Sequence, residues 1–494
     1  MKEWLYYIAF GLLLFAKGIG LYDGTTAFKL FLLPALACLA LKIFLTSYTR
    51  KEIVIAGVLL GVGAMTYLLS GEKGLLLYIL LMVGMKTVPV KRIFAVGLVA
   101  WSAAFFGITI SSLLHLYDTP YKVHAKLGLG YIFRWGLGYV HPNILHVSFL
   151  ILLFFIVYFI RERFNFKMFL LMMAANCYVF MYSVSYAGFG MVCIYLVLQL
   201  YQAKRKRLGI VEKVLSYMVF PVCAALSLVG PLVLEGRLYE LIDKVLNNRL
   251  HLSENFLKAE NISAFGVRVA DLISSTLTMD NAYVFSFITY GVFSFAGIFF
   301  LYELLIKKLI EKNMGTELVM TITILGYGLV EPFLFNTSLK NLSVIFIGAC
   351  LWRELEKETL KDRLWISIEE QWGGFKTVLA EKIRNKRKML LVGLLAGVII
   401  SVSYGLLVKM PESYMVQRVH CETIGKDLKT FPAQYIAEHP EVKAVDYVDD
   451  TTFMEIYSGN IVTVEWFRGC ISAFVLGTAV VWLIMSGYYI LKRE

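Results

Sequence analysis

The sequence predicts an all-α polytopic membrane protein with about 12 core transmembrane helices, and three observations support this fold class. The chain has 494 residues, of which 59% are hydrophobic and only 17% are charged. Its mean hydropathy is +0.69, and its apolar residues form long blocks rather than an alternating pattern. Short basic clusters separate these blocks, which is typical of the cytoplasmic loops of membrane proteins. These observations exclude a soluble globular protein of this length.

Apolar segments that are long enough, or nearly long enough, to cross roughly 30 Å of hydrocarbon define the predicted spans. The core segments are, in chain order, 4–21, 27–46, 53–69, 75–87, 93–116, 144–160, 168–182, 186–201, 214–234, 281–306, 318–335 and 342–352. Together they form a predicted transmembrane domain at 1–352, with a large polar loop at 235–280 between the ninth and tenth spans.

A second, smaller part of the chain follows this core. A charged segment at 353–388 leads into a C-terminal unit at 389–494, where two apolar spans flank a small external segment at 409–465. The stretch VDYVDDTTFMEIYSGNIVTVEW predicts a pair of β-strands around Ser458 and Gly459, because turn residues there separate two β-prone runs. We therefore expect a small folded segment outside the membrane.

The basic residues predict which loops are cytoplasmic. They cluster at 50–51, 91–92, 161–167, 204–207, 307–308, 353–388 and 492–493. With these clusters inside, both termini are cytoplasmic, and the loops 115–143, 235–280, 336–341 and 409–465 are external. The net charge of +12 is then a signal of topology, and nucleic acid is not an expected partner. The first apolar run lacks a cleavage site, so we expect a membrane anchor there rather than a signal peptide.

The cysteines and histidines do not predict a metal site. Of the seven cysteines, five fall within apolar runs and are expected to pack there. Cys421 and Cys470 lie in or near the C-terminal external segment and either pair or remain free. No CxxC or HExxH spacing occurs, so we expect no metal and no other cofactor.

The external loop at 235–280 is the first candidate reaction centre, because it breaks the positive-inside pattern. It contains Arg237, Arg249 and Arg268 and ends at Asp280. Arginine is suited to phosphate groups, since its planar guanidinium stays charged and bonds two oxygens at once. The alternative is that these arginines are solvated or contact lipid headgroups. The stretch LYELIDKVL between the first two predicts an amphipathic helix on the membrane surface.

A second set of candidate residues lies near the start of the sixth and the end of the eleventh span. Arg134 stands among glycines and aromatic residues, and His141-Pro142-Asn143 opens the sixth span. This triplet is either a simple helix start, where proline is well tolerated, or the lining of a polar pocket. Glu331 lies within the eleventh predicted span, where an ionisable group is costly unless it faces a polar cavity or a partner.

Asp280, Asn281 and Tyr283 open the tenth span. Asp280 is either a helix cap, which is favourable beside the helix dipole, or a general base. The two interpretations are compatible, because a carboxylate held by helix amides is also well positioned. We single out Asp280 and Arg249 as candidate catalytic residues.

These motifs together resemble a known family. RWGLGYVHPN resembles the Arg…Gly-x-x-His-Pro-Asn stretch of bacterial O-antigen and capsular polysaccharide polymerases. NNRLHLSENFLKAENISAFG resembles the external loop of that family, and MDNAYVFSFITYGVFS resembles its Asp-Asn-x-Tyr…Gly segment. The related O-antigen ligases usually have histidine where this chain has Asp280. The resemblance covers about residues 1–352, whereas the unit at 389–494 lies outside the family pattern.

The resemblance implies a metal-independent, inverting membrane glycosyltransferase. Such an enzyme transfers a polyprenyl-pyrophosphate-linked glycan to the hydroxyl of a second lipid-linked repeat unit, on the outer face of the bacterial cytoplasmic membrane. Under this hypothesis Asp280 accepts the hydroxyl proton and Arg249 stabilises the leaving pyrophosphate. The remaining candidates bind pyrophosphate or glycan: Arg134, Arg237, Arg268, His141, Asn143, Asn281, Tyr283 and Glu331. The lipid bilayer and a chain-length regulator or other export protein are expected partners.

Three alternatives remain open. The chain is an O-antigen-ligase-like transferase, a flippase or other transporter of lipid-linked oligosaccharides, or a peptidoglycan polymerase of the shape-and-division family. The absence of a convincing internal repeat counts against a transporter built from duplicated halves. Asp280 at the position of the ligase histidine favours a polymerase.

Overall fold

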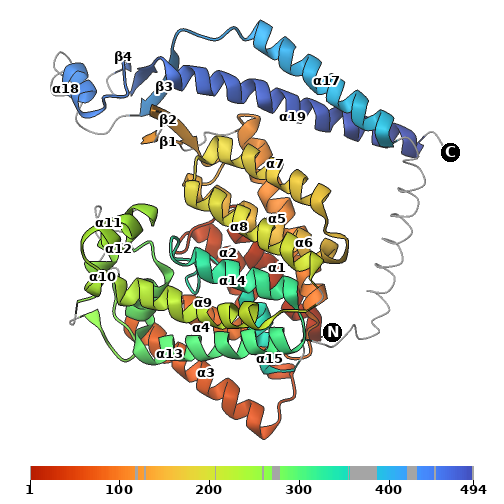
Figure 1. Cartoon of the computed structure of the whole chain (residues 1–494), viewed down its shortest axis with the longest axis vertical. Helices are drawn as coiled ribbons and strands as arrows, with labels where there is room; N and C mark the ends of the chain where they lie inside the picture. Colours follow the sequence, from red (N-terminus) through yellow and green to blue (C-terminus); the bar gives the residue numbers. More distant parts are fainter. Residues whose placement is uncertain are drawn as a thin grey trace. The chain divides into compact units, whose positions relative to one another are not determined.

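The computed structural model divides into two units, which are described separately because their relative position is not determined (Figure 1). It describes residues 2–116, 121–126, 130–205, 207–246, 248–258, 261–269, 279–353, 355, 386–419, 431–449 and 452–491. The first unit comprises Met1–Pro120 and Gly136–Leu360, and the second comprises Tyr121–Trp135 and Lys361–Glu494.

The chain is a multi-pass membrane protein. In the part that the structure describes, ten helices are long and apolar enough to cross a membrane, and they coincide with predicted spans. Those of the first unit are α2 (Thr26–Leu45), α3 (Arg50–Ser70), α5 (Val90–Leu113), α6 (Pro142–Ile160), α7 (Phe166–Ser183), α8 (Tyr186–Lys204), α9 (Ile210–Leu228) and α13 (Ala282–Glu311). A one-turn helix, α10 (Gly230–Val233), follows α9.

Four further predicted spans form shorter helices. These are α1 (Lys2–Gly18), α4 (Gly74–Gly84), α14 (Gly315–Tyr327) and α15 (Ser343–Leu351). The last three have 11, 13 and 9 residues, and at about 1.5 Å per residue none reaches across roughly 30 Å. Most of their residues are buried, so these helices pack inside the bundle. The predicted count of about 12 core spans is therefore not reproduced at full length.

The predicted span 318–335 ends early, at Tyr327, for a local reason. Proline lacks an N–H group and excludes the residue before it from helical geometry. Pro332 therefore keeps Glu331 out of a continuing helix, and residues 328–342 form a non-helical connection that we call the α14–α15 loop. The loop is largely buried, so its polar groups need protein partners.

Other helices supply some of those partners. The Tyr290 hydroxyl on α13 donates to the Phe335 carbonyl at 2.7 Å. The Asn341 side chain donates to the hydroxyl of Tyr302 at 2.9 Å, and its backbone N–H donates to the hydroxyl of Tyr78 on α4 at 3.3 Å. These bonds hold the α14–α15 loop against two helices that lie far from it in the sequence.

Helix α13 is interrupted at Gly291, and the external loop docks into the break. Gly291 has φ 79° and ψ 172°, a conformation that essentially only glycine adopts. The backbone N–H groups of Val292 and Phe293 donate to the carbonyls of Ser263 and Ala264 at 3.0 and 3.2 Å. These contacts join the second and third motifs of the sequence analysis.

The second unit contains β-structure, so the prediction of an all-α protein is wrong here. Strands β1 (Tyr121–Lys126) and β2 (Gly130–Trp135) form an antiparallel hairpin. Strands β3 (Tyr414–Val419), β5 (Thr452–Tyr457) and β4 (Ala444–Asp449) form an antiparallel sheet in that order. The predicted C-terminal strand pair exists, but as β4 and β5. Gly459 instead lies just before a helix.

The hairpin β1–β2 completes the core of this C-terminal unit. The ring of Phe133 is fully buried and packs with Val442, Tyr457 and Ile461. The Arg468 guanidinium donates to the Phe133 carbonyl at 2.9 Å. Because β1 and β2 come from the predicted external loop 115–143, the structure adds a distant piece of chain to the predicted C-terminal unit.

Two apolar helices pack side by side in the same unit, α17 (Lys386–Leu407) and α19 (Asn460–Leu491) (Figure 1). Small residues allow their close approach, as in many membrane helix pairs. A Cβ atom at Gly397 would lie 2.0 Å from the Thr478 hydroxyl, and one at Gly477 would lie 2.6 Å from the Ile400 side chain. A short helix, α18 (Phe431–Glu438), lies in the segment between them.

Replacing Gly291 with alanine should destabilise the first unit. The new Cβ would lie 2.4 Å from the Gly266 nitrogen, and the backbone strain alone costs about 1–3 kcal/mol. We expect a lower melting temperature in detergent and faster proteolysis of the external loop. Gly297→Ala on the same helix is the control, since nothing lies within 4 Å of its Cβ position. Equal melting temperatures for the two variants would contradict the docking.

Phe133→Ala should unfold the C-terminal unit selectively. The change removes a fully buried ring, which typically costs about 3–5 kcal/mol. The measurement is limited proteolysis at increasing denaturant concentrations. Unfolding of the unit is followed as cleavage of the chain between residues 409 and 465. Tyr131→Ala, on the same strand but 39% exposed, should leave the cleavage midpoint near wild type. A midpoint shift of the same size in both variants would argue against the hairpin as part of this core.

Candidate functional site

The predicted surface helix of the external loop is present as α11 (Gly236–Val245). Its apolar residues Leu238, Leu241 and Val245 are 55%, 61% and 75% exposed. They are spaced for one helical face, which is the pattern of a helix that lies in a membrane interface. The residue at the centre of the candidate site opens the next helix, a few positions after Val245.

That residue is Arg249, the first residue of helix α12 (Arg249–Glu254). The Asp243 carboxylate at the end of α11 accepts hydrogen bonds from the backbone N–H groups of Leu250 and His251 at 2.9 and 3.2 Å. Asn248 adopts a left-handed conformation, with φ 63°. This sharp connection between the two helices directs Arg249 inward, where its side chain is only 6% exposed.

The Arg249 guanidinium faces two carboxylates without bonding tightly to either. Its Nη2 lies 3.8 Å from Asp280 Oδ2 and 3.9 Å from Glu331 Oε1. Both distances exceed the range of a hydrogen bond. Nη1 donates to the Leu246 carbonyl at 3.2 Å, and Nε is buried without a partner. A buried donor without an acceptor is costly, so the site has unused capacity for an anion.

Glu331 is held on the other side of this cluster. The Asn143 side-chain amide donates to Glu331 Oε1 at 3.0 Å. Burial raises the pKa of the Glu331 carboxyl to about 7, although the Arg249 guanidinium opposes the rise, and Asp280 adds to it. Glu331 therefore sits near the pKa that suits a general base at neutral pH.

The His141-Pro142-Asn143 motif positions Asn143 for this contact. His141 caps α6, because its Nδ1 accepts a hydrogen bond from the Asn143 backbone N–H at 3.1 Å. Pro142 occupies the first helical position, where its missing N–H costs nothing. The motif is thus both a helix start and part of the polar cluster, so both interpretations hold.

Asn281, rather than Asp280, caps helix α13. Its side-chain oxygen accepts from the backbone N–H groups of Tyr283 and Val284 at 2.9 and 3.2 Å. The interpretation of Asp280 as the cap is therefore wrong. Asp280, 41% exposed, faces Arg249 instead. Tyr283 is fully buried, and its hydroxyl donates to the Leu325 carbonyl on α14 at 2.9 Å.

The remaining predicted arginines lie apart from this cluster or cannot be placed against it. Arg237 and Arg268 are exposed in the first unit, on α11 and in the external loop. Arg134 is buried in β2 and folds with the C-terminal unit. The structure therefore brings together Arg249, Asp280, Glu331 and Asn143 from four separate stretches of chain.

Sequence analysis missed three groups that the fold brings to attention. The Tyr327 hydroxyl, at the end of α14, is buried without a partner and interacts electrostatically with Glu331 and Arg249. Lys340 is buried in the α14–α15 loop. A lysine in a short predicted external loop is a weak signal, because most such lysines are solvated.

The third group is a sealed hydrogen-bonded triplet on α6 and α7. The ring of His146 bonds to the Ser183 hydroxyl at 2.9 Å and to the Asn176 side chain at 2.8 Å. The residue types suggest a nucleophile with its base, but all three side chains are fully buried. A substrate cannot reach them, so the triplet holds the two helices together.

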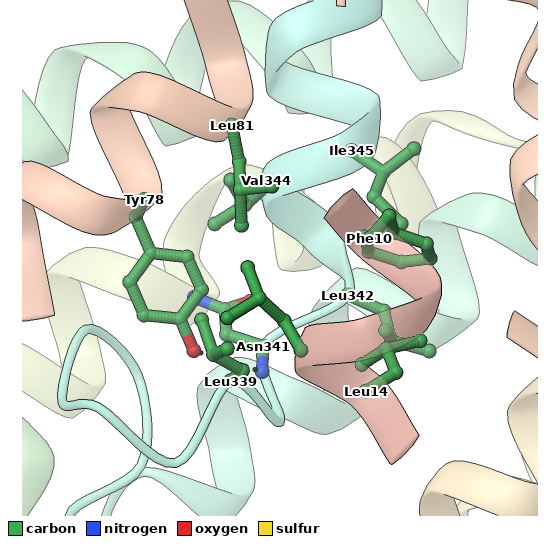
Figure 2. Close-up of a pocket in the computed structure, with 10 residues that line it drawn as sticks. Phe10, Leu14, Tyr78, Leu81, Leu339, Asn341, Leu342, Val344 and Ile345 are labelled. Atoms are coloured by element: carbon green, nitrogen blue, oxygen red, sulfur yellow. Dashed lines mark hydrogen bonds between the residues drawn. The ribbon is translucent and has the colours of Figure 1, made fainter. Parts of the chain in front are cut away.

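The described cavities lie away from the Arg249 cluster. One of about 310 Å³ is at the opposite end of α14, lined by polar residues that include Arg161, Gln199 and Glu317. Another, of about 10 Å³, is enclosed mainly by apolar side chains between α1, α4, α15 and the α14–α15 loop (Figure 2). Its volume is close to the minimum for one water molecule, so it is a packing void.

Among the residues that the structure describes, no group of three histidines, cysteines or acidic residues could hold a metal ion. Cys421 lies outside the described residues, so its pairing with Cys470 stays a prediction. The first unit is thus a membrane-embedded helical bundle with a buried arginine between two carboxylates. Comparisons with family models, with curated proteins and with solved structures found no match to this chain.

Proposed function

We propose that the protein is a membrane glycosyltransferase that polymerises polyprenyl-pyrophosphate-linked oligosaccharide repeat units into a surface polysaccharide. The reaction takes place on the outer face of the bacterial cytoplasmic membrane. One observation carries the proposal: the buried, incompletely bonded Arg249 lies between Asp280 and Glu331, in a protein of membrane-crossing helices. The bilayer holds the polyprenyl tails, and the external loops receive the sugars.

Arg249 acts on the leaving group. When the bond between the anomeric carbon and the pyrophosphate oxygen breaks, the electron pair and negative charge go to pyrophosphate. A buried guanidinium with an unused donor stabilises that charge strongly, because little water competes with it. The carboxylates at 3.8 and 3.9 Å keep the arginine in place without saturating its donors.

Glu331 and Asp280 divide the remaining tasks. The acceptor hydroxyl oxygen attacks the anomeric carbon from the face opposite the pyrophosphate, so the configuration inverts, and its proton moves to a carboxylate. The pKa of Glu331, raised to about 7 by burial, suits it to accept this proton at neutral pH, and Asn143 orients it. Asp280 is more exposed, and we assign it to the binding of the incoming acceptor.

The same geometry also supports a second candidate, a proton-coupled transporter of lipid-linked oligosaccharides. A buried carboxylate with a pKa near 7 exchanges a proton readily at physiological pH, as proton relays in transporters do. Purified protein supplied with lipid-linked repeat units on one side distinguishes the two. A polymerase forms a ladder of longer chains, whereas a transporter moves unchanged repeat units across the bilayer. An O-antigen-ligase-like transferase would add one chain to a different acceptor.

Glu331→Gln should abolish polymer formation, and the wild-type rate should fall as pH drops through about 7. The base works only when deprotonated, and a carboxyl with a pKa of about 7 loses roughly tenfold of its active form per pH unit below that value. Because the neutral amide avoids the cost of burying a charge, the variant should be at least as stable as wild type at pH 8. The rate of ladder formation from pH 5 to pH 9 checks this.

Asp280→Asn serves as the comparison for that experiment. It should raise the KM for the acceptor and leave the acidic limb of the pH profile in place. Glu331→Gln with near-normal activity, together with an inactive Asp280→Asn, would assign the base to Asp280 instead.

Arg249→Lys should lower activity about 100-fold or more without changing membrane abundance. Lysine keeps the charge but loses the planar set of donors, and removal of one such donor commonly costs two to three orders of magnitude in rate. Arg237→Lys is the matched control, because Arg237 is exposed in the same external loop. If Arg249→Lys reduced abundance as much as activity, the arginine would be structural.

A further inference from the structure

A polar cavity of the first unit lies at the start of α14, whereas Glu331 follows the end of that helix. The helix has 13 residues, so its two ends are about 20 Å apart. The cavity has a volume of about 310 Å³, which falls within the range of small-molecule sites in proteins. It is formed by the one-turn helix η1 (Arg161–Arg163), the end of α8 and the start of α14. The cavity is therefore separate from the Arg249 cluster.

Planar polar side chains line this cavity. Arg161 and Glu162 come from η1, Gln199 and Gln202 from α8, and Glu317 from α14. Guanidinium, carboxylate and amide groups each present two or more hydrogen-bonding atoms in one plane. A cavity lined in this way suits a ligand that carries many hydrogen-bond donors and acceptors, rather than an apolar ligand.

Parts of the lining have unused hydrogen-bonding capacity. Gln199 is 1% exposed, and its Nε2 donates to the Thr316 hydroxyl at 2.9 Å. Its Oε1 is buried and has no partner among the residues that the structure describes. No side chain caps the start of α14, and the N–H groups of a first helical turn have no acceptor within the helix. An unpaired acceptor beside unpaired donors suits a ligand that both donates and accepts.

The arginines of the cavity already have acidic partners. Arg161 Nη1 lies 2.6 Å from Glu317 Oε1, and Arg205 Nη2 lies 3.3 Å from Glu212 Oε1. Glu162 adds a further negative charge to the lining. Among the lining residues that the structure describes, no unpaired cation remains to attract a strongly charged anion. A neutral ligand can enter without the loss of either ion pair.

We propose that this cavity binds a small neutral molecule with several hydroxyl groups, of the class of free monosaccharides and polyols. Each hydroxyl both donates and accepts hydrogen bonds. One such ligand can therefore bond to Gln199 Oε1, to the first turn of α14 and to the planar side chains at once. The basic clusters at 161–167 and 204–207 border the cavity, so we expect the ligand on the predicted cytoplasmic side. The inference does not depend on the proposed function.

The test is equilibrium dialysis of the purified full-length protein, in a detergent without a sugar headgroup. The probes are radiolabelled glucose and glycerol, with inorganic phosphate and glycine as charged comparisons. Wild type should bind glucose more tightly than it binds either charged probe. Ala203→Trp should abolish glucose binding, because Ala203 lines the cavity and the indole ring would occupy it. Ala203 is also exposed, so the melting temperature of this variant should match that of wild type.

A second variant and a matched control complete the experiment. Gln199→Leu removes the unpaired acceptor and should weaken glucose binding about tenfold, the usual effect of one lost hydrogen bond to a buried group. Lys204→Trp is the control for added bulk. Lys204 is the next residue of α8 and is exposed, but it does not line the cavity. This control should bind glucose like wild type.

The outcomes separate the site from its ligand class. Loss of glucose binding in Ala203→Trp, with normal binding in Lys204→Trp, would support the inference. Equal glucose binding by wild type and Ala203→Trp, or none by wild type, would overturn it. Tighter binding of phosphate or glycine that Ala203→Trp removes would overturn the neutral ligand class. If Ala203→Trp lowers the melting temperature, Gln199→Leu decides: affinity equal to that of wild type would then overturn the inference. Polymer formation enters none of these outcomes, so the proposed function is tested separately.

Discussion

The first unit depends on one physical constraint: polar groups that are buried need hydrogen-bond partners within the protein. The α14–α15 loop is non-helical and largely buried, so tyrosines of α4 and α13 form hydrogen bonds with its backbone and with its Asn341 side chain. In a membrane protein, irregular backbone is tolerated only where protein or a polar cavity surrounds it. The same loop carries Glu331, so the bonds that make the irregular backbone possible also position this carboxylate of the candidate site.

The broken helix α13 applies the same principle to the external loop. Interruption at Gly291 exposes backbone N–H groups, and the segment Ser263–Gly266 supplies their acceptors. The loop also needs a glycine at its side of this contact. A Cβ at Gly266 would lie 1.9 Å from the Thr289 carbonyl oxygen. This docking fixes the far end of the external loop, while the connection between α11 and α12 fixes Arg249. The loop is therefore anchored at both sides of the residue that the proposed chemistry requires.

The hairpin β1–β2 links the two units through the chain itself. It folds with the C-terminal sheet, and the chain continues from Trp135 directly into the turn before His141 and Asn143. Loss of the C-terminal unit would expose the buried face of Phe133 and release one end of that turn.

The sequence by itself determined the membrane class, the positions of the ten long helices and the polar stretches in which Arg249, Asp280 and Asn143 lie. These properties follow from hydropathy and composition over short windows, which are local. Only the tertiary structure decided that Arg249 is buried while Arg237 and Arg268 are exposed, that Asn281 rather than Asp280 caps α13, and that Glu331 lies in a non-helical loop. Each of these depends on contacts between residues far apart in the chain. Such contacts are set by packing and by the cost of unsatisfied buried groups, and no local pattern encodes them.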